Sequence, residues 1–509
     1  MSNLTRNKIL AILATLLTIF TTISLLLTYN DLFITLSVVT AIGLSIAIRD
    51  SIQTKHSLLR NYPLIGRLRW VFEHERSKIQ QYFIENDTNG TPFNREARSD
   101  VYQKAKKDIN TTPFGTQLDV YENGYEFIKH SMYPKSTEDV KEPRVIIGSK
   151  FCKQWYSASI LNVSAMSYGA LSDAAVRAIN GGAQLGNFYQ NTGEGGLSPY
   201  HLDNGGDLCF QVGTGYFGAG KTIDGKRYFD ETAFTENALR PSVKMIEIKL
   251  SQGAKPGHGG ILPAKKNTQE IADIRGVEPG VDVMSPPYHT AFDSNDTMLS
   301  FIKKLRFLSG GKPIGIKMCL GNEQEVADLI KLMKLKNTYP DFITIDGGEG
   351  GTGAAPIVFT NSIGTPLVDA LVFVVKQLQI NGLRDQVKVI ASGKVSNSFD
   401  IIKLLSLGAD LVNAARAFML SLGCIQAREC NKNTCPVGIA TQNPQLVKGL
   451  NPAEKKVRVF NYHEGVIHEV REVMAAMGVL TTQELKPSHI SVRVDKSSIV
   501  TYKDIFKQI

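Results

Sequence analysis

Three cysteines lie within twelve residues in the stretch GCIQARECNKNTCPVGIATQNP at 423–444. They are Cys424, Cys430 and Cys435, half of the six cysteines in the 509-residue sequence. A disulfide would pair two of them and leave one over, and a structural zinc ion usually takes four protein ligands. The spacing alone therefore leaves open what holds the three thiols together.

The composition indicates an ordered chain with a large core. Apolar residues make up 43 % of the sequence, and six cysteines in 509 residues are too few for a secreted disulfide framework. The formal charge is +9, but no basic stripe interleaved with aromatic residues stands out, so no nucleic-acid partner is expected. Part of the positive charge lies in the first 70 residues, where it suggests proximity to a membrane.

Two uncharged apolar stretches, 9–27 and 32–48, are each about long enough to cross a bilayer. A cleaved signal peptide is the alternative for the first stretch, but no small-x-small cleavage site precedes the second. Arg6 and Lys8 precede the first stretch, five Lys or Arg residues follow the second up to position 69, and the connecting break has none. The positive-inside rule predicts a two-helix anchor in the cell membrane, with the N-terminus and the body in the cytoplasm.

Short β-rich apolar runs alternate with helical patterns from about residue 158 onward. We expect strands at 160–167, 187–191, 245–251, 281–287, 314–320, 342–348, 387–393 and 411–419. This alternation implies parallel pairing, and eight strand–helix units match a (β/α)8 TIM barrel. A doubly wound sheet is the alternative, but no G-x-G-x-x-G follows the first run.

The predicted fold class is therefore α/β, a (β/α)8 barrel with an N-terminal transmembrane helical hairpin. The expected parts are the hairpin at 1–50, a helical membrane-proximal cap at 51–150, the barrel at 151–480 and a C-terminal tail at 481–509.

Glycine-rich segments follow most of the predicted strands, at the end of a barrel where chemistry takes place. Examples are NTGEGG at 191–196 and DGGEGGTGAAP at 346–356. Glycine-rich turns allow backbone N–H groups to approach an anion, and the loops after strands 7 and 8 are the usual phosphate site of such barrels. A phosphate-binding group is expected from the residues that share this end, Gly351, Thr352, Gly393 and Arg416.

Lys317 lies within the otherwise apolar strand IGIKMCL. A lysine inside a barrel is costly unless a partner compensates its charge, whereas a lysine at a strand edge can reach solvent. A reduced flavin would be such a partner, since an ammonium near its N1 atom and C2 oxygen stabilises the negative charge there.

Several long motifs, in order, resemble one family. AMSYGALS, NTGEGG, IKLSQGAKPGHGGILP, SPPYH, DGGEGGTGAAP and the cysteine stretch are similar to the FMN-binding, glutamate-forming domain of the glutamate synthase large subunit, over about 150–480. In that family the barrel holds FMN beside a [3Fe–4S] cluster, and its three cysteines have this spacing. The resemblance implies that Cys424, Cys430 and Cys435 are cluster ligands, and Cys435-Pro436 is similar to the Cys-Pro of ferredoxin motifs. Zinc with an outside ligand and a [4Fe–4S] cluster with another ligand are the alternatives.

The resemblance also implies a set of residues that contact FMN: Ala165, Met166, Ser167, Asn191, Lys317, Gly347, Gly348, Gly351, Thr352, Ser392, Gly393 and Arg416. The family's substrate is 2-oxoglutarate, and cations and an amide suited to its two carboxylates are present as Lys249, Gln252 and Lys255. Glu194 would position or deprotonate ammonium. The implied reaction forms a 2-imino acid from ammonia and the keto acid, and FMN, reduced through the cluster, then reduces it to L-glutamate.

The sequence also sets expectations about the ammonia source, the substrates and the electron donor. It begins MSNLTRNK and has no cysteine before Cys152, so we expect no glutaminase domain and the use of free ammonia. A keto acid or an amine other than that of the synthase is an alternative. No NADPH-binding fingerprint is visible, so the expected electron donor is ferredoxin or a separate reductase. A membrane-tethered electron-transfer or redox-sensing flavoprotein without glutamate formation is the alternative function, and a flavin-dependent oxidase or isomerase is a third.

Overall fold

The computed structural model describes residues 2–27, 31–109 and 111–507. The chain divides into two compact units, residues 1–90 and residues 91–509.

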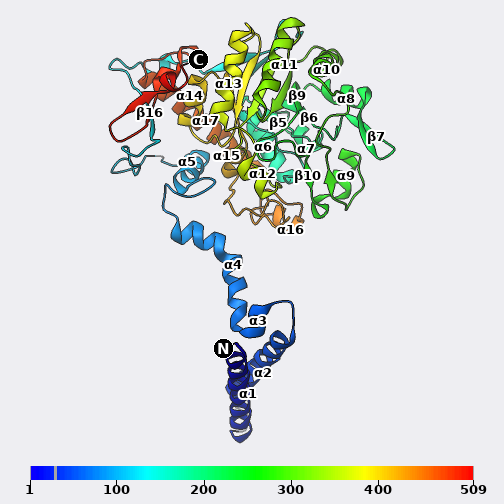
Figure 1. Cartoon of the computed structure of the whole chain (residues 1–509), viewed down its shortest axis with the longest axis vertical. Coiled ribbons are helices and arrows are strands. Elements are labelled where there is room, and N and C mark those ends of the chain that lie inside the picture. The colour runs from blue at the N-terminus through cyan, green and yellow to red at the C-terminus, as the bar shows by residue number, and fades with distance from the viewer. Residues whose placement is uncertain (1, 28–30, 110, 508–509) are drawn as a thin grey trace. The chain divides into compact units, whose positions relative to one another are not determined.

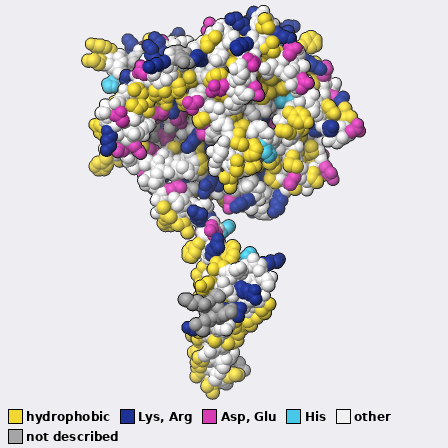
Figure 2. All heavy atoms as spheres, viewed as in Figure 1, with side chains coloured by type: hydrophobic (Ala, Val, Ile, Leu, Met, Phe, Trp, Pro, Cys, Tyr) yellow, Lys and Arg dark blue, Asp and Glu magenta, His cyan; other side chains and the backbone are white. Residues whose placement is uncertain are grey.

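The first unit contains the two apolar helices, α1 (Ser2–Leu26) and α2 (Asp31–Ile52), which pack against each other as a hairpin (Figure 1). Both are long and apolar enough to cross a membrane by length and composition, and almost none of their side chains are buried in the protein. Hydrophobic side chains are prominent on the visible face of this hairpin (Figure 2). Shorter helices follow: α3 (Ser57–Asn61), η1 (Ile65–Arg67), α4 (Leu68–Ile79) and η2 (Gln80–Ile84).

A closed barrel of eight parallel strands forms the second unit, which confirms the predicted fold (Figure 1). In barrel order the strands are β4 (Leu161–Val163), β5 (Gln190–Asn191), β6 (Leu208–Val212), β9 (Val243–Lys249), β12 (Ile314–Met318), β13 (Phe342–Asp346), β14 (Lys388–Ser392) and β15 (Leu411–Ala414). The barrel closes where β15 pairs in parallel with β4. Helices between the strands include α6 (Asp173–Gly186), α10 (Asn295–Leu308), α11 (Glu323–Leu335), α13 (Leu367–Ile380) and α14 (Ser398–Ser406).

The sequence prediction of a barrel strand at 281–287 is wrong. That segment contains β11 (Val283–Met284), which pairs antiparallel with β10 (Ile261–Leu262) outside the barrel. The strand that the prediction missed is β6, so the run at 245–251 corresponds to the fourth strand rather than the third. Every residue of β6 is buried although Gln211 interrupts its apolar run, because a polar partner inside the barrel accepts a hydrogen bond from that amide.

This partner is Glu247 of β9, a carboxylate only 1 % exposed in the barrel interior. It accepts hydrogen bonds from Gln211 Nε2 at 2.7 Å, Asn191 Nδ2 at 2.8 Å and Thr344 Oγ1 at 2.6 Å. A buried carboxylate is tolerated when donors satisfy its oxygens. The network joins four strands and fixes the side chains just below the mouth of the barrel.

Strands outside the barrel tie the two ends of the second unit together. β1 (Glu126–Ile128) pairs antiparallel with β16 (Ile490–Arg493), which also pairs with β17 (Ile499–Thr501). β2 (Arg144–Ile147) and β3 (Tyr156–Ser159) form a hairpin before the first barrel strand. The long helix α17 (Pro452–Ala476) packs on α5 (Arg95–Lys106) and α6. Residues 91–150 and 481–507 therefore belong structurally to the barrel unit.

Candidate active site

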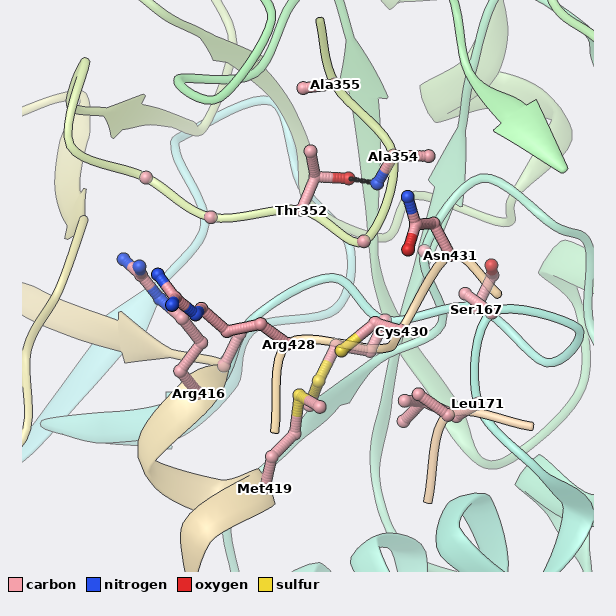
Figure 3. A pocket seen from close by; sticks show the side chains of 18 of the residues that line it. Ser167, Leu171, Thr352, Ala354, Ala355, Arg416, Met419, Arg428, Cys430 and Asn431 are labelled. Carbon is pink, nitrogen blue, oxygen red and sulfur yellow. Dashed lines mark hydrogen bonds between the residues drawn. The ribbon is translucent and has the colours of Figure 1, made fainter. Parts of the chain in front are cut away.

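The carboxyl ends of the barrel strands surround a cavity of about 720 Å³ (Figure 3). It is lined by thirteen of the predicted site residues: Ala165, Met166, Ser167, Glu194, Lys249, Gln252, Lys255, Gly351, Thr352, Arg416, Cys424, Cys430 and Cys435. A smaller cavity shares part of this lining and is also lined by three further predicted residues, Lys317, Ser392 and Gly393. Residues separated by up to 270 positions in the sequence thus border one space.

An ion pair between Glu194 and Lys249 lies at the mouth of the barrel, with Lys249 Nζ 2.8 Å from Glu194 Oε1. Burial by itself raises the pKa of Glu194, but Lys249, together with Arg275 and Lys255, holds this pKa below its ordinary value. Gly260 leaves room for the carboxylate, because a Cβ there would lie 2.3 Å from Glu194 Oε1. Glu194 is therefore an anion within a group of cations.

Lys255 is a second ammonium at the cavity wall, and its side chain is buried. Burial lowers its pKa to about 8, and the nearby charge of Lys249 contributes to this shift, while Glu194 opposes it. A lysine with such a pKa exchanges protons readily near neutral pH.

Arg275 is a third cation of this group, and the sequence reasoning did not identify it. It is the last residue of α9 (Gln269–Arg275), is buried, and donates from Nη2 to Tyr168 O at 3.1 Å. Among the described residues its Nε has no hydrogen-bond partner. Arg275 also lines the cavity, and a guanidinium at a cavity wall is suited to bind a carboxylate. The only sequence signal was an arginine twenty residues after Lys255, with no motif around it.

His289 supports the carboxyl end of β9 from behind. Its Nε2 lies 2.9 Å from Lys249 O, and its Nδ1 lies 3.0 Å from Tyr216 Oη. A carbonyl can only accept, so Nε2 carries the proton and Nδ1 accepts from the Tyr216 hydroxyl, which itself accepts from Ala291 N at 3.0 Å. Burial lowers the pKa of His289 to about 4, which keeps the ring neutral. The histidine of the SPPYH motif thus positions the strand that carries Lys249.

Lys317 has a protein partner inside the barrel. Its Nζ lies 3.2 Å from Asp346 Oδ2 on the neighbouring strand, and both side chains are mostly buried. Burial favours a lower pKa for Lys317, but Asp346 and Glu247 raise the pKa above its ordinary value. Asp346 also accepts from Gly253 N at 3.0 Å and Ser392 Oγ at 3.1 Å. The sequence correctly required a partner for Lys317 but did not identify Asp346.

Arg416 begins α15 (Arg416–Ser421) after the last barrel strand, and Figure 3 shows it on the cavity wall. Its Nη2 donates to Glu349 O at 2.9 Å, and its guanidinium lies over the Phe93 ring at 5.1 Å. Gly351 allows this approach, because a Cβ there would lie 2.8 Å from the guanidinium carbon. Glycine backbone and a guanidinium therefore meet at the predicted phosphate site.

The cysteine loop follows α15 and borders the same cavity. All three thiols are free of disulfide bonds. Burial raises the pKa of Cys424 to about 11 and also raises that of Cys430, and the neighbouring cysteines reinforce both shifts. The loop takes a tight course through left-handed backbone conformations at Gln426, Arg428 and Asn433. Among the residues that the structure describes, no three His, Cys, Asp or Glu side chains are placed to hold one metal ion.

Residues 96–480 match the family described as "Conserved region in glutamate synthase". The chain belongs to the glutamate synthase family.

Two relatives show how far this similarity extends. The glutamate synthase large subunit-like protein YerD of Bacillus subtilis is 37 % identical over 503 residues, which cover 91 % of this chain and 95 % of that protein. An archaeal glutamate synthase [NADPH] of Methanocaldococcus jannaschii is 32 % identical over 371 residues, covering 72 % of this chain and 68 % of that protein. Among solved structures, a flavocytochrome b2 double mutant with sulfite bound has a TM-score of 0.44 at 14 % identity, covering 83 % and 85 % of the two chains.

Three of the residues that the glutamate synthase resemblance assigned to FMN lie outside the lining of both cavities: Asn191, Gly347 and Gly348. Asn191 donates to Glu247 and accepts from Gly193 N at 3.0 Å, so its side chain holds the loop that carries Glu194. Gly347 packs against the loop after β9, where a Cβ on Gly253 would lie 1.7 Å from Gly347 O. In this structure these residues shape the site from behind its surface.

Proposed function

We propose that this chain is a flavin- and iron–sulfur-dependent oxidoreductase that reductively aminates 2-oxoglutarate to L-glutamate with free ammonia. The observation that carries the proposal is the group of three cations, Lys249, Lys255 and Arg275, around Glu194 at the wall of the cavity. A dicarboxylate needs cationic hydrogen-bond donors at each end, and the keto carbon needs a proton donor and acceptor nearby. This group contains both kinds of residue.

Lys249 and Arg275 bind the carboxylates of the keto acid in this proposal, and Gln252 contributes an amide at the same wall. The Glu194 carboxylate orients ammonia and accepts a proton from its nitrogen as the C–N bond forms. The carbonyl oxygen must leave as water and therefore needs protons. Lys255 is suited to supply them, because its pKa of about 8 makes its ammonium a better proton donor than an ordinary lysine.

The residues at the other wall fit FMN. Gly351 and Arg416 would hold its phosphate, Ala165, Met166 and Ser167 would border its ring, and the Lys317 ammonium would face its pyrimidine edge. The fit rests on the close approach of Gly351 to the Arg416 guanidinium and on the cavity of about 720 Å³. When bound, FMN would supply the two electrons that reduce the imino acid.

We propose that the cysteine loop holds an iron–sulfur cluster rather than a single zinc ion. Ligands of one zinc ion converge on one point, whereas three cysteines of a [3Fe–4S] cluster each bind a different iron and stand farther apart. Cys424, Cys430 and Cys435 border one cavity, and no disulfide joins them. Such a cluster would pass electrons from an external donor. Since relatives carry NADPH in their names and this sequence has no fingerprint for it, we propose ferredoxin or a separate reductase as that donor.

The hairpin of α1 and α2 anchors the chain in the cell membrane in this proposal, with the catalytic body in the cytoplasm. The length and apolar composition of the two helices and the distribution of Lys and Arg around them support this location.

The test follows reoxidation of the flavin without an added electron acceptor. Full-length protein is purified anaerobically, its flavin is reduced, and 2-oxoglutarate, ammonium or both are added while absorbance and L-glutamate are measured. Reoxidation that requires both substrates and yields L-glutamate supports the proposal. A flavin that both substrates leave reduced overturns it and favours the electron-transfer alternative.

Variants on a single strand sharpen this test. Lys249→Met should abolish the reoxidation, whereas Lys244→Met removes a cation from the opposite end of β9, outside the cavity lining, and should preserve it. A panel of other keto acids and amines in the same assay identifies the preferred substrates.

A further inference from the structure

Lys266 connects the two loops that would hold the two cofactors. It ends the short helix η4 (Ala264–Lys266) and is only 2 % exposed. Its Nζ donates to Ala170 O at 2.8 Å and to Cys430 O at 3.1 Å. Ala170 belongs to the AMSYGALS loop after the first barrel strand, and Cys430 is the middle cysteine of the cysteine loop. One buried ammonium therefore bridges segments 260 positions apart.

The charge of this ammonium has no carboxylate partner. Both hydrogen-bond acceptors are backbone carbonyls, and among the described residues Lys266 forms no ion pair with Asp or Glu. Burial lowers the pKa of Lys266 to about 8 and Arg275 contributes to this shift, whereas Cys430 and Cys435 oppose it. A buried cation without an anion is costly, so an anionic group held by the cysteine loop would compensate the charge of Lys266.

A neutral side chain makes a parallel connection between the same segments. Gln442, seven residues after Cys435, donates from Nε2 to Leu171 O at 2.7 Å and to Gly169 O at 3.2 Å. These carbonyls flank Ala170. Gln442 therefore joins the same two loops through hydrogen bonds alone, whereas Lys266 joins them through hydrogen bonds and a charge.

We propose that Lys266 is the positioning residue that holds the cysteine loop against the flavin loop and that its charge favours the reduced form of the cluster. This inference rests on the proposed iron–sulfur centre. When an external one-electron donor reduces the cluster, the cluster gains one negative charge. A fixed ammonium beside it in a low-dielectric site lowers the energy of that charged state more than that of the oxidised state. Electron entry is then easier than it would be beside a neutral side chain.

The experiment compares three variants of the full-length protein with the wild type: Lys266→Met, Lys266→Arg and Gln442→Leu. Iron content is measured first. The midpoint potential of the cluster is then determined by anaerobic titration with dithionite and redox mediators, followed by the paramagnetic signal of the oxidised cluster. We expect a lower potential for Lys266→Met, a potential close to the wild type for Lys266→Arg, and no shift for Gln442→Leu, which removes a link but no charge.

An unchanged potential in an iron-loaded Lys266→Met variant overturns the inference, as does an equal shift in Gln442→Leu. If Lys266→Met loses its iron, the iron content of a second neutral variant, Lys266→Gln, tests the role of the charge. Iron loss from both neutral variants but not from Lys266→Arg supports that role. Iron loss from Lys266→Arg as well contradicts it. A wild-type protein without iron would instead refute the proposed cluster itself, so the two failures are distinguishable.

Discussion

Lys317 of β12 and Asp346 of β13 form an ion pair inside the barrel, with 3.2 Å between Nζ and Oδ2. The two residues sit on adjacent parallel strands at the end that opens into the site. The pair explains how the barrel tolerates a lysine, and it holds the ammonium at the wall of the smaller cavity, next to the proposed flavin site.

Replacing Lys317 by Met should therefore have two measurable effects. Asp346 would remain buried without its cation, so the free energy of unfolding should fall by about 3 kcal/mol in urea titrations. The reduction potential of the flavin should fall, because a nearby positive charge is lost. The double variant Lys317→Met/Asp346→Asn should recover part of the stability but not the potential. A flavin potential equal to that of the wild type would assign Lys317 a purely structural role.

The affinity for 2-oxoglutarate should decrease as the pH rises through about 8. Lys255 is protonated below that pH and loses its charge above it, since burial lowers its pKa to about 8. Calorimetric titrations between pH 6.5 and 9.5 would show this decrease. The Lys255→Met variant should bind 2-oxoglutarate weakly, and its affinity should not change with pH over the same range. Affinity that stays constant through pH 8 in the wild type would show that the charge of Lys255 does not contribute to substrate binding.

The lowered pKa of Lys255 also makes the free energy of unfolding depend on pH. Between pH 8 and the ordinary lysine pKa of 10.5, the unfolded chain binds more protons at Lys255 than the folded one. The contribution of this residue to the free energy of unfolding must therefore rise with pH in that window. Chemical denaturation of the wild type and of Lys255→Met at several pH values measures the free energy of unfolding of each protein. The wild-type value minus the variant value should increase toward pH 10.

The Tyr216 hydroxyl should stabilise the buried ring of His289. Tyr216→Phe leaves His289 Nδ1 without a donor and Ala291 N without an acceptor. The expected cost is about 1–3 kcal/mol of unfolding free energy. Nitrogen-15 NMR of labelled histidine should show His289 protonated at Nε2 in both proteins, because Lys249 O still accepts from Nε2 in the variant. A wild-type ring protonated at Nδ1 would contradict the arrangement.

Changing Cys430 to Ser should remove the absorbance and paramagnetic signal of the cluster while much of the flavin stays bound. The matched control is Cys152→Ser, because Cys152 Sγ donates to Asp341 Oδ1 at 3.1 Å and a serine hydroxyl can take over that bond. Metal analysis of anaerobically purified wild type is the decisive measurement. Stoichiometric zinc without iron would refute an iron–sulfur centre.

The α1–α2 hairpin should anchor the protein. Full-length protein is expected in the membrane fraction after a high-salt wash, whereas a chain that starts at residue 56 should be soluble and retain its flavin. The apolar surface of two membrane spans is removed by this truncation, and the barrel belongs to the other compact unit. Recovery of the full-length protein in the salt-washed soluble fraction would argue against anchoring.

Local patterns in the sequence were sufficient to predict the features that depend on residues close together in the chain. Alternating strands and helices predicted the barrel, because each unit carries its own periodicity. The spacing of Cys424, Cys430 and Cys435 and the motifs around Glu194, Lys249 and Lys255 identified side chains that do border one cavity. These residues lie at strand ends, and the carboxyl ends of parallel strands must meet at one rim.

Only the tertiary structure decided which residues are neighbours across the barrel. β6 pairs with β5 and β9 in the barrel, where its buried Gln211 donates to Glu247, a partner 36 residues away. Arg275 reaches the Glu194 group from a helix outside the barrel, and Asn191 faces Glu247 rather than either cavity. Pairings of this kind depend on strand register and barrel closure, which set distances between residues that are remote in sequence and that no local pattern encodes.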